Sequence, residues 1–150
     1  MIGLDATTLI AYEIEEHALH SSVRVGVRKV VADGETFGLS DQTVWEFLHI
    51  VTDARRFRDP LTMDDALERA ARWSNAYEVT DLYPTGETRG WTLKWMKDYG
   101  LGRKRILDTA LAAVFHTHGI SRIATANRSD FECFGVFTFE QWALAEASRG

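Results

Sequence analysis

The chain opens with Met1-Ile-Gly-Leu-Asp5-Ala-Thr-Thr-Leu-Ile10, a short apolar run that ends in an acid and leads into residues with helical spacing. Apolar residues continue at helical intervals and predict a helix over residues 7–15. Asp5 therefore lies at the carboxyl end of a predicted strand, directly before a helix. It serves there either as a helix N-cap or as a ligand in the crevice found at this edge of open α/β sheets.

The same alternation of strand and helix continues along the rest of the chain. Spacing and turn residues predict helices over residues 19–31, 41–53, 62–77, 91–99 and 106–117, a short helix from Glu140, and strands over residues 36–40, 78–83, 120–125 and 134–138. Strands that alternate with helices imply βαβ units. We therefore expect residues 1–150 to form one α/β domain, with a mainly parallel sheet covered by helices on both faces.

Length and composition limit the class of protein. A chain of 150 residues, 45% of them hydrophobic, suits one compact globular domain and excludes collagen, disorder and a multidomain assembly. Cys133 is the only cysteine, which excludes an internal disulfide and a thiolate-rich zinc or iron–sulfur site. The sequence also lacks a secretion signal and a long apolar run, so we expect a cytoplasmic protein.

Charge argues at first against a nucleic-acid partner, because the formal net charge is −5. Divalent cations held by several of the acids would supply positive charge locally. Basic residues also form two clusters, one of Arg55, Arg56 and Arg58 and one of Arg103, Lys104 and Arg105. The second cluster directly precedes Asp108, and we expect it to contact phosphates. A solvated loop is the alternative for both clusters.

Two further acids lie on predicted helices. Asp108 lies on a helix that is apolar nearly all round, where an unpaired carboxylate costs several kcal/mol. It needs either a cation or the free backbone N–H groups of the first helical turn. Glu46 lies on the narrow polar strip of its helix, and periodicity alone favours a solvent-facing side chain.

The loop after the strand at residues 120–125 carries the last polar group. It reads Thr125-Ala-Asn127-Arg-Ser-Asp130-Phe131, so Asn127 or Asp130 can reach the same sheet edge as Asp5. An Asx-turn is the ordinary alternative for this pair. Mg²⁺ and Mn²⁺ prefer oxygen ligands, and two such ions can activate a water and stabilise the leaving oxygen of a phosphodiester. Convergence of these acids therefore predicts a metal site suited to phosphodiester hydrolysis.

Together these segments resemble the PIN domain, and more closely the VapC-type toxin ribonucleases of bacterial toxin–antitoxin pairs. The resemblance covers Ile2 to about Phe139 and rests on four pieces, Ile2-Gly-Leu-Asp5-Ala-Thr-Thr-Leu-Ile10, Ser40-Asp-Gln-Thr-Val-Trp-Glu46-Phe, Arg105-Ile-Leu-Asp108-Thr-Ala-Leu-Ala-Ala113 and Thr125-Ala-Asn127-Arg-Ser-Asp130-Phe131. The chain departs from the family at Ala6-Thr7, where Thr-Asn or Ser-Ser is common. It also has Asn127 where many members have the fourth acid.

The resemblance implies a PIN-like three-layer α/β/α fold and metal-dependent endonucleolytic cleavage of RNA. It implies a Mg²⁺ or Mn²⁺ site made of Asp5, Glu46, Asp108, Asn127 and Asp130, in which the four acids are catalytic and Thr7 and Thr125 supply supporting hydroxyls. Arg103, Lys104 and Arg105 then face the RNA substrate. A cognate antitoxin and a homodimer follow from the resemblance alone.

Three other functions stay open at this point. An RNA-processing nuclease without an antitoxin would share the fold and the acids. A flavodoxin-like signalling module would use clustered acids to bind Mg²⁺ and accept a phosphoryl group, but it needs a Lys at a late strand end, where this chain has Arg128. A scaffold would keep the fold without metals. The sequence has no P-loop, dinucleotide fingerprint or serine-hydrolase elbow.

Overall fold

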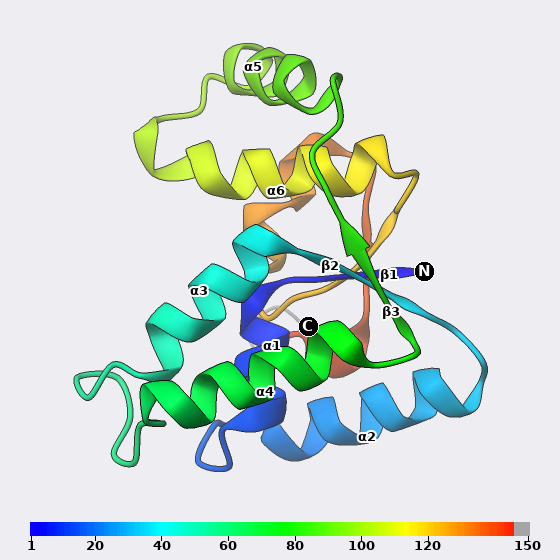
Figure 1. The fold of residues 1–150 in the computed structure, drawn as a ribbon. Coiled ribbons are helices and arrows are strands. Elements are labelled where there is room, and N and C mark those ends of the chain that lie inside the picture. The colour runs from blue at the N-terminus through cyan, green and yellow to red at the C-terminus, as the bar shows by residue number, and fades with distance from the viewer. Residues whose placement is uncertain (146–150) are drawn as a thin grey trace.

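The computed structural model describes residues 1–145, which form a five-stranded parallel sheet between two layers of helices (Figure 1). The strand order is β3-β2-β1-β4-β5, and every neighbouring pair is parallel. The strands are β1 (Ile2–Leu4), β2 (Phe37–Ser40), β3 (Val79–Leu82), β4 (Arg122–Ala124) and β5 (Thr138–Phe139). The predicted three-layer α/β/α fold is confirmed.

The helices divide between the two faces of the sheet. They are α1 (Ala6–Glu13), α2 (His20–Ala32), α3 (Asp41–Val51), α4 (Met63–Asn75), α5 (Thr88–Asp98) and α6 (Ile106–Thr117). In Figure 1, α1 to α4 lie on one side of the sheet, whereas α5 and α6 lie on the other. Local sequence sets several helix starts, since Ser40 caps α3 and Thr62 caps α4 through side-chain oxygens that accept backbone N–H groups.

Large apolar side chains fill the space on both faces of the sheet. Phe37 and Phe47 are buried on the α1–α4 face, and Phe115 and Phe131 are buried on the α5–α6 face. Gly3 in β1 allows α6 to approach, because a Cβ there would lie 2.8 Å from the ring of Phe115. The central strand is thus buried on both faces, as a parallel sheet requires.

The last predicted elements differ from the structure. The final strand is Thr138–Phe139 rather than residues 134–138, because Phe134 belongs to the 3₁₀ turn Glu132–Phe134 and stacks on Trp95, with ring centroids 4.5 Å apart. Gly135 then ends that turn with a φ of 70°. The short helix expected from Glu140 is a 3₁₀ turn at Gln141–Ala143. The rest of that predicted helix lies outside the described residues.

The topology places a ligand crevice beside β1. From β1 the chain proceeds outward through β2 and β3, and then returns to the other side of β1 as β4, so the strand order reverses between β1 and β4. Open α/β sheets bind ligands outside the carboxyl ends of the strands at such a reversal. Flavodoxin-like modules have the order 2-1-3-4-5. The signalling-module alternative is therefore wrong for this chain.

None of the helices described within residues 1–145 is long and apolar enough to cross a bilayer.

Candidate active site

Asp5 occupies the reversal point, and its carboxylate is held by three donors. The side chain is only 6% exposed. Its Oδ1 accepts from the backbone N of Ala6 at 2.9 Å, which makes it the N-cap of α1. Its Oδ2 accepts from Thr125 Oγ1 at 2.6 Å and from Thr7 Oγ1 at 3.1 Å. Asp5 therefore has a fixed orientation at the carboxyl edge of the sheet.

Thr7 and Thr125 link Asp5 to the loop that follows β4. Thr7 Oγ1 accepts from the backbone N of Ala126 at 2.9 Å, and Thr125 Oγ1 accepts from the backbone N of Asn127 at 3.0 Å. Each hydroxyl thus donates to Asp5 and accepts from the loop. The family resemblance implied both residues as supporting hydroxyls, and the structure places both against Asp5.

Two further hydroxyls, which the sequence analysis did not single out, fix the strands at this edge. Thr8 Oγ1 donates to the carbonyl of Ala124 at 2.7 Å, and Thr43 Oγ1 donates to the carbonyl of Leu4 at 2.9 Å. Both threonines are buried. Their signal in the sequence is a hydroxyl on an otherwise apolar helix face, just after a strand end, where a free carbonyl needs a donor.

Glu46, Asp108 and Asp130 converge on Asp5. Partial desolvation, followed by repulsion from Asp5, Asp108 and Asp130, raises the pKa of Glu46 to about 7 although its side chain is exposed. Desolvation and repulsion from Asp130 and Asp5 raise the pKa of Asp108 to about 6. Burial also raises the pKa of Asp5 and of Asp130. The four acids thus form one mutually repelling group at the reversal point.

Asp108 lacks the hydrogen bonds that a helix-start role would require. Within residues 1–145, neither Asp108 nor Glu46 accepts a hydrogen bond through its carboxylate, and α6 has no side-chain cap. Asp5, in contrast, both caps a helix and faces the acidic group. A helix-capping role therefore accounts for one of the carboxylate oxygens of Asp5, but it does not account for the Asp108 carboxylate.

Asn127 and Asp130 lie at the two ends of the 3₁₀ turn that follows β4. The backbone N of Asp130 donates to the carbonyl of Asn127 at 3.0 Å, and the Asn127 side chain makes no cap hydrogen bond, so the pair forms a backbone 3₁₀ turn rather than the Asx-turn that was the ordinary alternative. Asn127 is exposed, whereas Asp130 is half-buried and repels the other three acids. Asp130 is therefore better placed than Asn127 to supply a fourth ligand beside Asp5, Glu46 and Asp108.

The acidic group suits a hydrated divalent cation. No three His, Cys, Asp or Glu side chains within residues 1–145 already surround one point at ligand distances. Mg²⁺, however, uses one or two carboxylates and keeps several waters, so a preformed cage is not needed. Asp5 has a fixed orientation, whereas the carboxylates of Glu46 and Asp108 accept no hydrogen bond within residues 1–145 and are partly desolvated. A cation would satisfy them both.

The two basic clusters differ in their contacts. Arg55 and Arg56 pair with Asp53 at 3.2 Å and 3.7 Å, so the first cluster is largely an ion-pair group at the end of α3. In the second cluster, Arg103 and Lys104 are exposed. Arg105 points inward instead and donates to the carbonyl of Asp130. Within the second cluster, Arg103 and Lys104 therefore face solvent and Arg105 does not.

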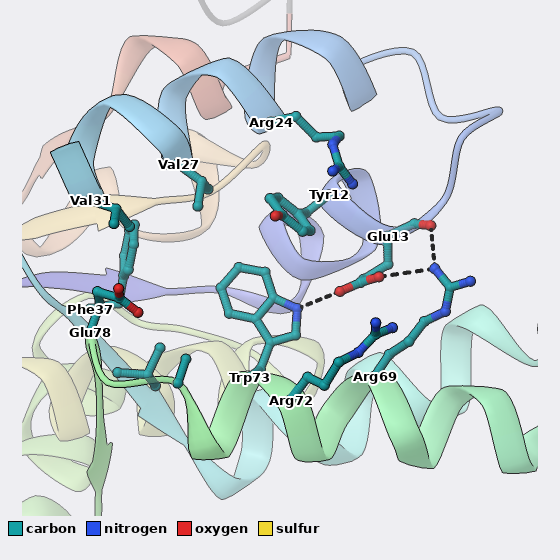
Figure 2. A pocket seen from close by; sticks show the side chains of 12 residues that line it. Tyr12, Glu13, Arg24, Val27, Val31, Phe37, Arg69, Arg72, Trp73 and Glu78 are labelled. Atoms are coloured by element: carbon teal, nitrogen blue, oxygen red, sulfur yellow. Dashed lines mark hydrogen bonds and ion pairs between the residues drawn. The ribbon is translucent and has the colours of Figure 1, made fainter.

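A cavity of about 460 Å³ lies between α1, α2 and α4 (Figure 2), and its lining residues include none of the four acids. Its lining includes Phe37 and Val79, the first residues of β2 and β3, so it lies at the amino-terminal edge of the sheet. Glu13 accepts from Arg69 Nη1 at 3.0 Å and from Trp73 Nε1 at 2.9 Å there. Glu13 thus joins α1 to two donors of α4 on the wall of this cavity.

Comparison with known proteins gives matches in structure alone. No protein-family model and no curated protein matches the sequence. VapC20 of Mycobacterium tuberculosis, a sarcin-ricin loop cleaving toxin, superposes with a TM-score of 0.67 at 17% identity, over 91% of this chain and 96% of that one. VapBC2 of Rickettsia felis, bound to a DNA fragment from its promoter, gives 0.64 at 15% identity, over 93% and 98%.

A third solved structure agrees with these two. FitAcB of Neisseria gonorrhoeae superposes with a TM-score of 0.63 at 17% identity, over 96% of this chain and all of that one (100%). Identities at this level establish shared architecture. The chain therefore has the PIN-like α/β/α fold of the VapC-type proteins.

Proposed function

We propose that this chain is a metal-dependent endoribonuclease, the toxin component of a toxin–antitoxin pair. One observation carries the proposal: four acids converge at the reversal point of a fold that an RNA-cleaving toxin shares. Two of these acids, Glu46 and Asp108, have partly desolvated carboxylates and accept no hydrogen bond within residues 1–145. Structural acids are normally paired, so this arrangement favours a cation-binding role.

Each of the four acids would supply a ligand to the ion. Asp5, fixed by Ala6, Thr7 and Thr125, gives the least mobile ligand. Asp108 and Glu46 complete the set from α6 and α3, and Asp130 adds a fourth carboxylate from the loop. When bound, Mg²⁺ or Mn²⁺ activates a water and stabilises the charge that develops on the phosphodiester. No side chain forms a covalent bond to the RNA.

The test is cleavage of a total RNA pool by the purified protein, with the new ends mapped by sequencing. We expect cuts within the strands when Mg²⁺ or Mn²⁺ is present and none in EDTA, with activity restored when the metal is added back. Intact RNA under every metal condition, or equal cleavage in EDTA, would contradict the proposal. The circular dichroism spectrum of each sample shows whether the protein is folded.

The proposed partner is a cognate antitoxin, and the proposed setting is the cytoplasm. The fold neighbour from Rickettsia felis is a VapBC2 assembly bound to promoter DNA, which supports a partner of this kind. A gene for a small DNA-binding protein directly upstream, whose product co-purifies with this chain and blocks its activity, is the expected finding. An active nuclease without such a neighbour would instead be an RNA-processing enzyme.

We also propose a homodimer. Two large apolar side chains are exposed beside the acids, Trp45 at 62% and Leu107 at 67%. Gln42 Nε2 donates to the carbonyl of Leu107 at 2.7 Å, which joins α3 to the start of α6. Such exposed side chains favour a protein contact. Sedimentation equilibrium measures the mass in solution, and a monomer at every concentration would contradict the dimer.

A further inference from the structure

Arg105 lies between the start of α6 and the loop that carries Asp130, and its guanidinium points into the protein. Its Nη2 donates to the backbone carbonyl of Asp130 at 2.6 Å and lies 3.8 Å from Sγ of Cys133. Its Nε is buried and has no hydrogen-bond partner within residues 1–145. An unsatisfied buried nitrogen costs free energy, so an arginine held in this way calls for an explanation.

The backbone of Arg105 is also fixed by a hydrogen bond. Thr109, which is fully buried, donates from Oγ1 to the carbonyl of Arg105 at 2.6 Å. Arg105 is the residue that precedes α6, and Asp108 follows three residues later. One residue is thus joined to Asp108 through the helix and to Asp130 through a hydrogen bond.

The charge of Arg105 acts on both acids. Its positive charge lowers the pKa of Asp108 and of Asp130, against the burial that raises them. Arg103 and Lys104, its neighbours in the same 3₁₀ turn, are exposed to solvent. Arg105 therefore differs in environment from the two cations beside it, although the sequence presents all three alike.

We propose that Arg105 is a positioning residue, which holds the Asp130 loop against α6 and so sets the separation of the Asp108 and Asp130 carboxylates. This inference rests on the proposed function, because the two acids are taken to bind the cation. The guanidinium suits this place, since its terminal Nη2 carries two N–H groups and contacts both the carbonyl of Asp130 and Sγ of Cys133. It replaces the expectation, drawn from the sequence, that Arg105 contacts RNA.

The substitution Arg105→Lys separates the two roles. Lysine keeps the positive charge and binds phosphate well, so a phosphate contact would survive the change. The lysine ammonium ends one bond short of the position of Nη2, so the hydrogen bond to the Asp130 carbonyl would be lost. Arg89→Lys makes the same substitution at an exposed position on α5 and is the matched control.

The first measurement needs no metal. Hydrogen exchange of the metal-free protein reports the backbone amides of Asp130 and Phe131, which donate within the 3₁₀ turn at 3.0 Å each. We expect both amides to exchange faster in Arg105→Lys, while circular dichroism and Arg89→Lys remain like wild type. Unchanged exchange at these two amides in Arg105→Lys would overturn the positioning role.

The second measurement is Mn²⁺ affinity, read from the rise in melting temperature during a titration. Loss of a residue that orients metal ligands typically weakens metal binding about 10- to 100-fold, and we expect Arg105→Lys to fall in this range. With RNA, kcat should drop while KM stays near the wild-type value. Wild-type Mn²⁺ affinity in Arg105→Lys would also overturn the proposal. If the wild type itself binds no Mn²⁺, the proposed function fails, and hydrogen exchange still decides the role of Arg105.

Discussion

At the scale of single residues, the site consists of acids with the same charge in different surroundings. Asp5 has three donors and a fixed orientation. Glu46 and Asp108 have no donors within residues 1–145, and desolvation together with the other acids raises their pKa values to about 7 and about 6. Without a cation these carboxylates oppose folding near neutral pH, and with one they should favour it.

The metal-free protein should therefore lose stability as the pH rises towards neutrality. The pKa of Glu46 rises on folding from 4.5 to about 7, so the folded state binds this proton more tightly than the unfolded state. The resulting penalty is absent below the unfolded pKa, grows as the pH rises through the interval, and is complete above the folded pKa. Urea unfolding in EDTA at several pH values measures this slope, which Glu46→Gln should flatten.

The matched control is Glu68→Gln, which removes a carboxylate from the exposed side of α4. It should leave the pH dependence of the unfolding free energy unchanged. If Glu46→Gln and the wild type lose stability in parallel from acidic to neutral pH, the proposed repulsion at Glu46 does not exist.

The sequence allowed the acids to be identified but not their surroundings. Asp5 could be placed at the sheet edge, because an acid after a short apolar run ends a strand. Asp108 could be identified as an acid that needs a cation or backbone donors, because its helix is apolar nearly all round. The inward direction of Arg105 could not be predicted, since three consecutive basic residues do not show which one faces the protein. The donors to Asp5 come partly from Thr125, 120 positions away, a pairing that only the fold creates.

At the scale of elements, the three residues of the 3₁₀ turn Arg103–Arg105 have two different environments. Arg105 holds the Asp130 loop, whereas Arg103 and Lys104 are exposed beside the start of α6. We therefore expect the phosphate contact of this cluster from the two exposed cations alone. Ion pairing with Asp53 leaves less charge available in the other basic cluster.

Replacing Arg103 and Lys104 together by Ala should weaken RNA binding and flatten its dependence on salt. Each lost phosphate contact lowers the slope of log affinity against log salt by about 0.7 for single strands. Fluorescence anisotropy with labelled RNA in EDTA measures the slope without cleavage. Arg89→Ala with Lys97→Ala removes two exposed cations from α5 as the control. Wild-type affinity and slope in the Arg103 and Lys104 variant would show that these two side chains are only solvated and do not contact RNA.

The strand predicted over residues 134–138 is wrong at its start, because packing in the core determines the conformation there. The apolar residues 134–138 have the composition of a strand, yet Phe134 stacks on Trp95 and Gly135 takes a positive φ, which delays pairing with β4 until Thr138. The helices were predicted more closely, because their apolar spacing extends over many residues and their caps, Ser40 and Thr62, are visible in the sequence.

At the scale of the whole molecule, the topology gathers acids that are far apart in the chain. Alternating strands and helices predicted a parallel sheet, and βαβ connections bring the carboxyl ends of the strands to one edge. The order β3-β2-β1-β4-β5 could not be predicted, because hydrophobic periodicity does not state which strands are neighbours. That order sets β1 beside β4, and so Asp5 beside Thr125.

A cation shared by several elements should stabilise the entire fold. A ligand at 100 times its dissociation constant stabilises the folded state by about 2.7 kcal/mol. In a domain of this size that corresponds to a rise in melting temperature of about 5 to 10 °C. Thermal melts at neutral pH with Mn²⁺ and with EDTA measure the difference. Identical melting temperatures with Mn²⁺ and with EDTA would contradict the proposed metal site.

The most direct test of the central claim is RNA cleavage by Asp108→Asn in the presence of Mn²⁺. Asparagine keeps the size of the side chain and removes the charge that would hold a cation. Asp64→Asn is the matched control, because Asp64 is also an acid in the first turn of a helix but is exposed on α4.

The expected result is a folded Asp108→Asn protein, by circular dichroism, with Mn²⁺-dependent cleavage nearly abolished, beside wild-type cleavage by Asp64→Asn. A helix-start role alone predicts a loss of about 1 kcal/mol of stability or less, and full activity. Cleavage at the wild-type rate by folded Asp108→Asn would contradict the proposed site.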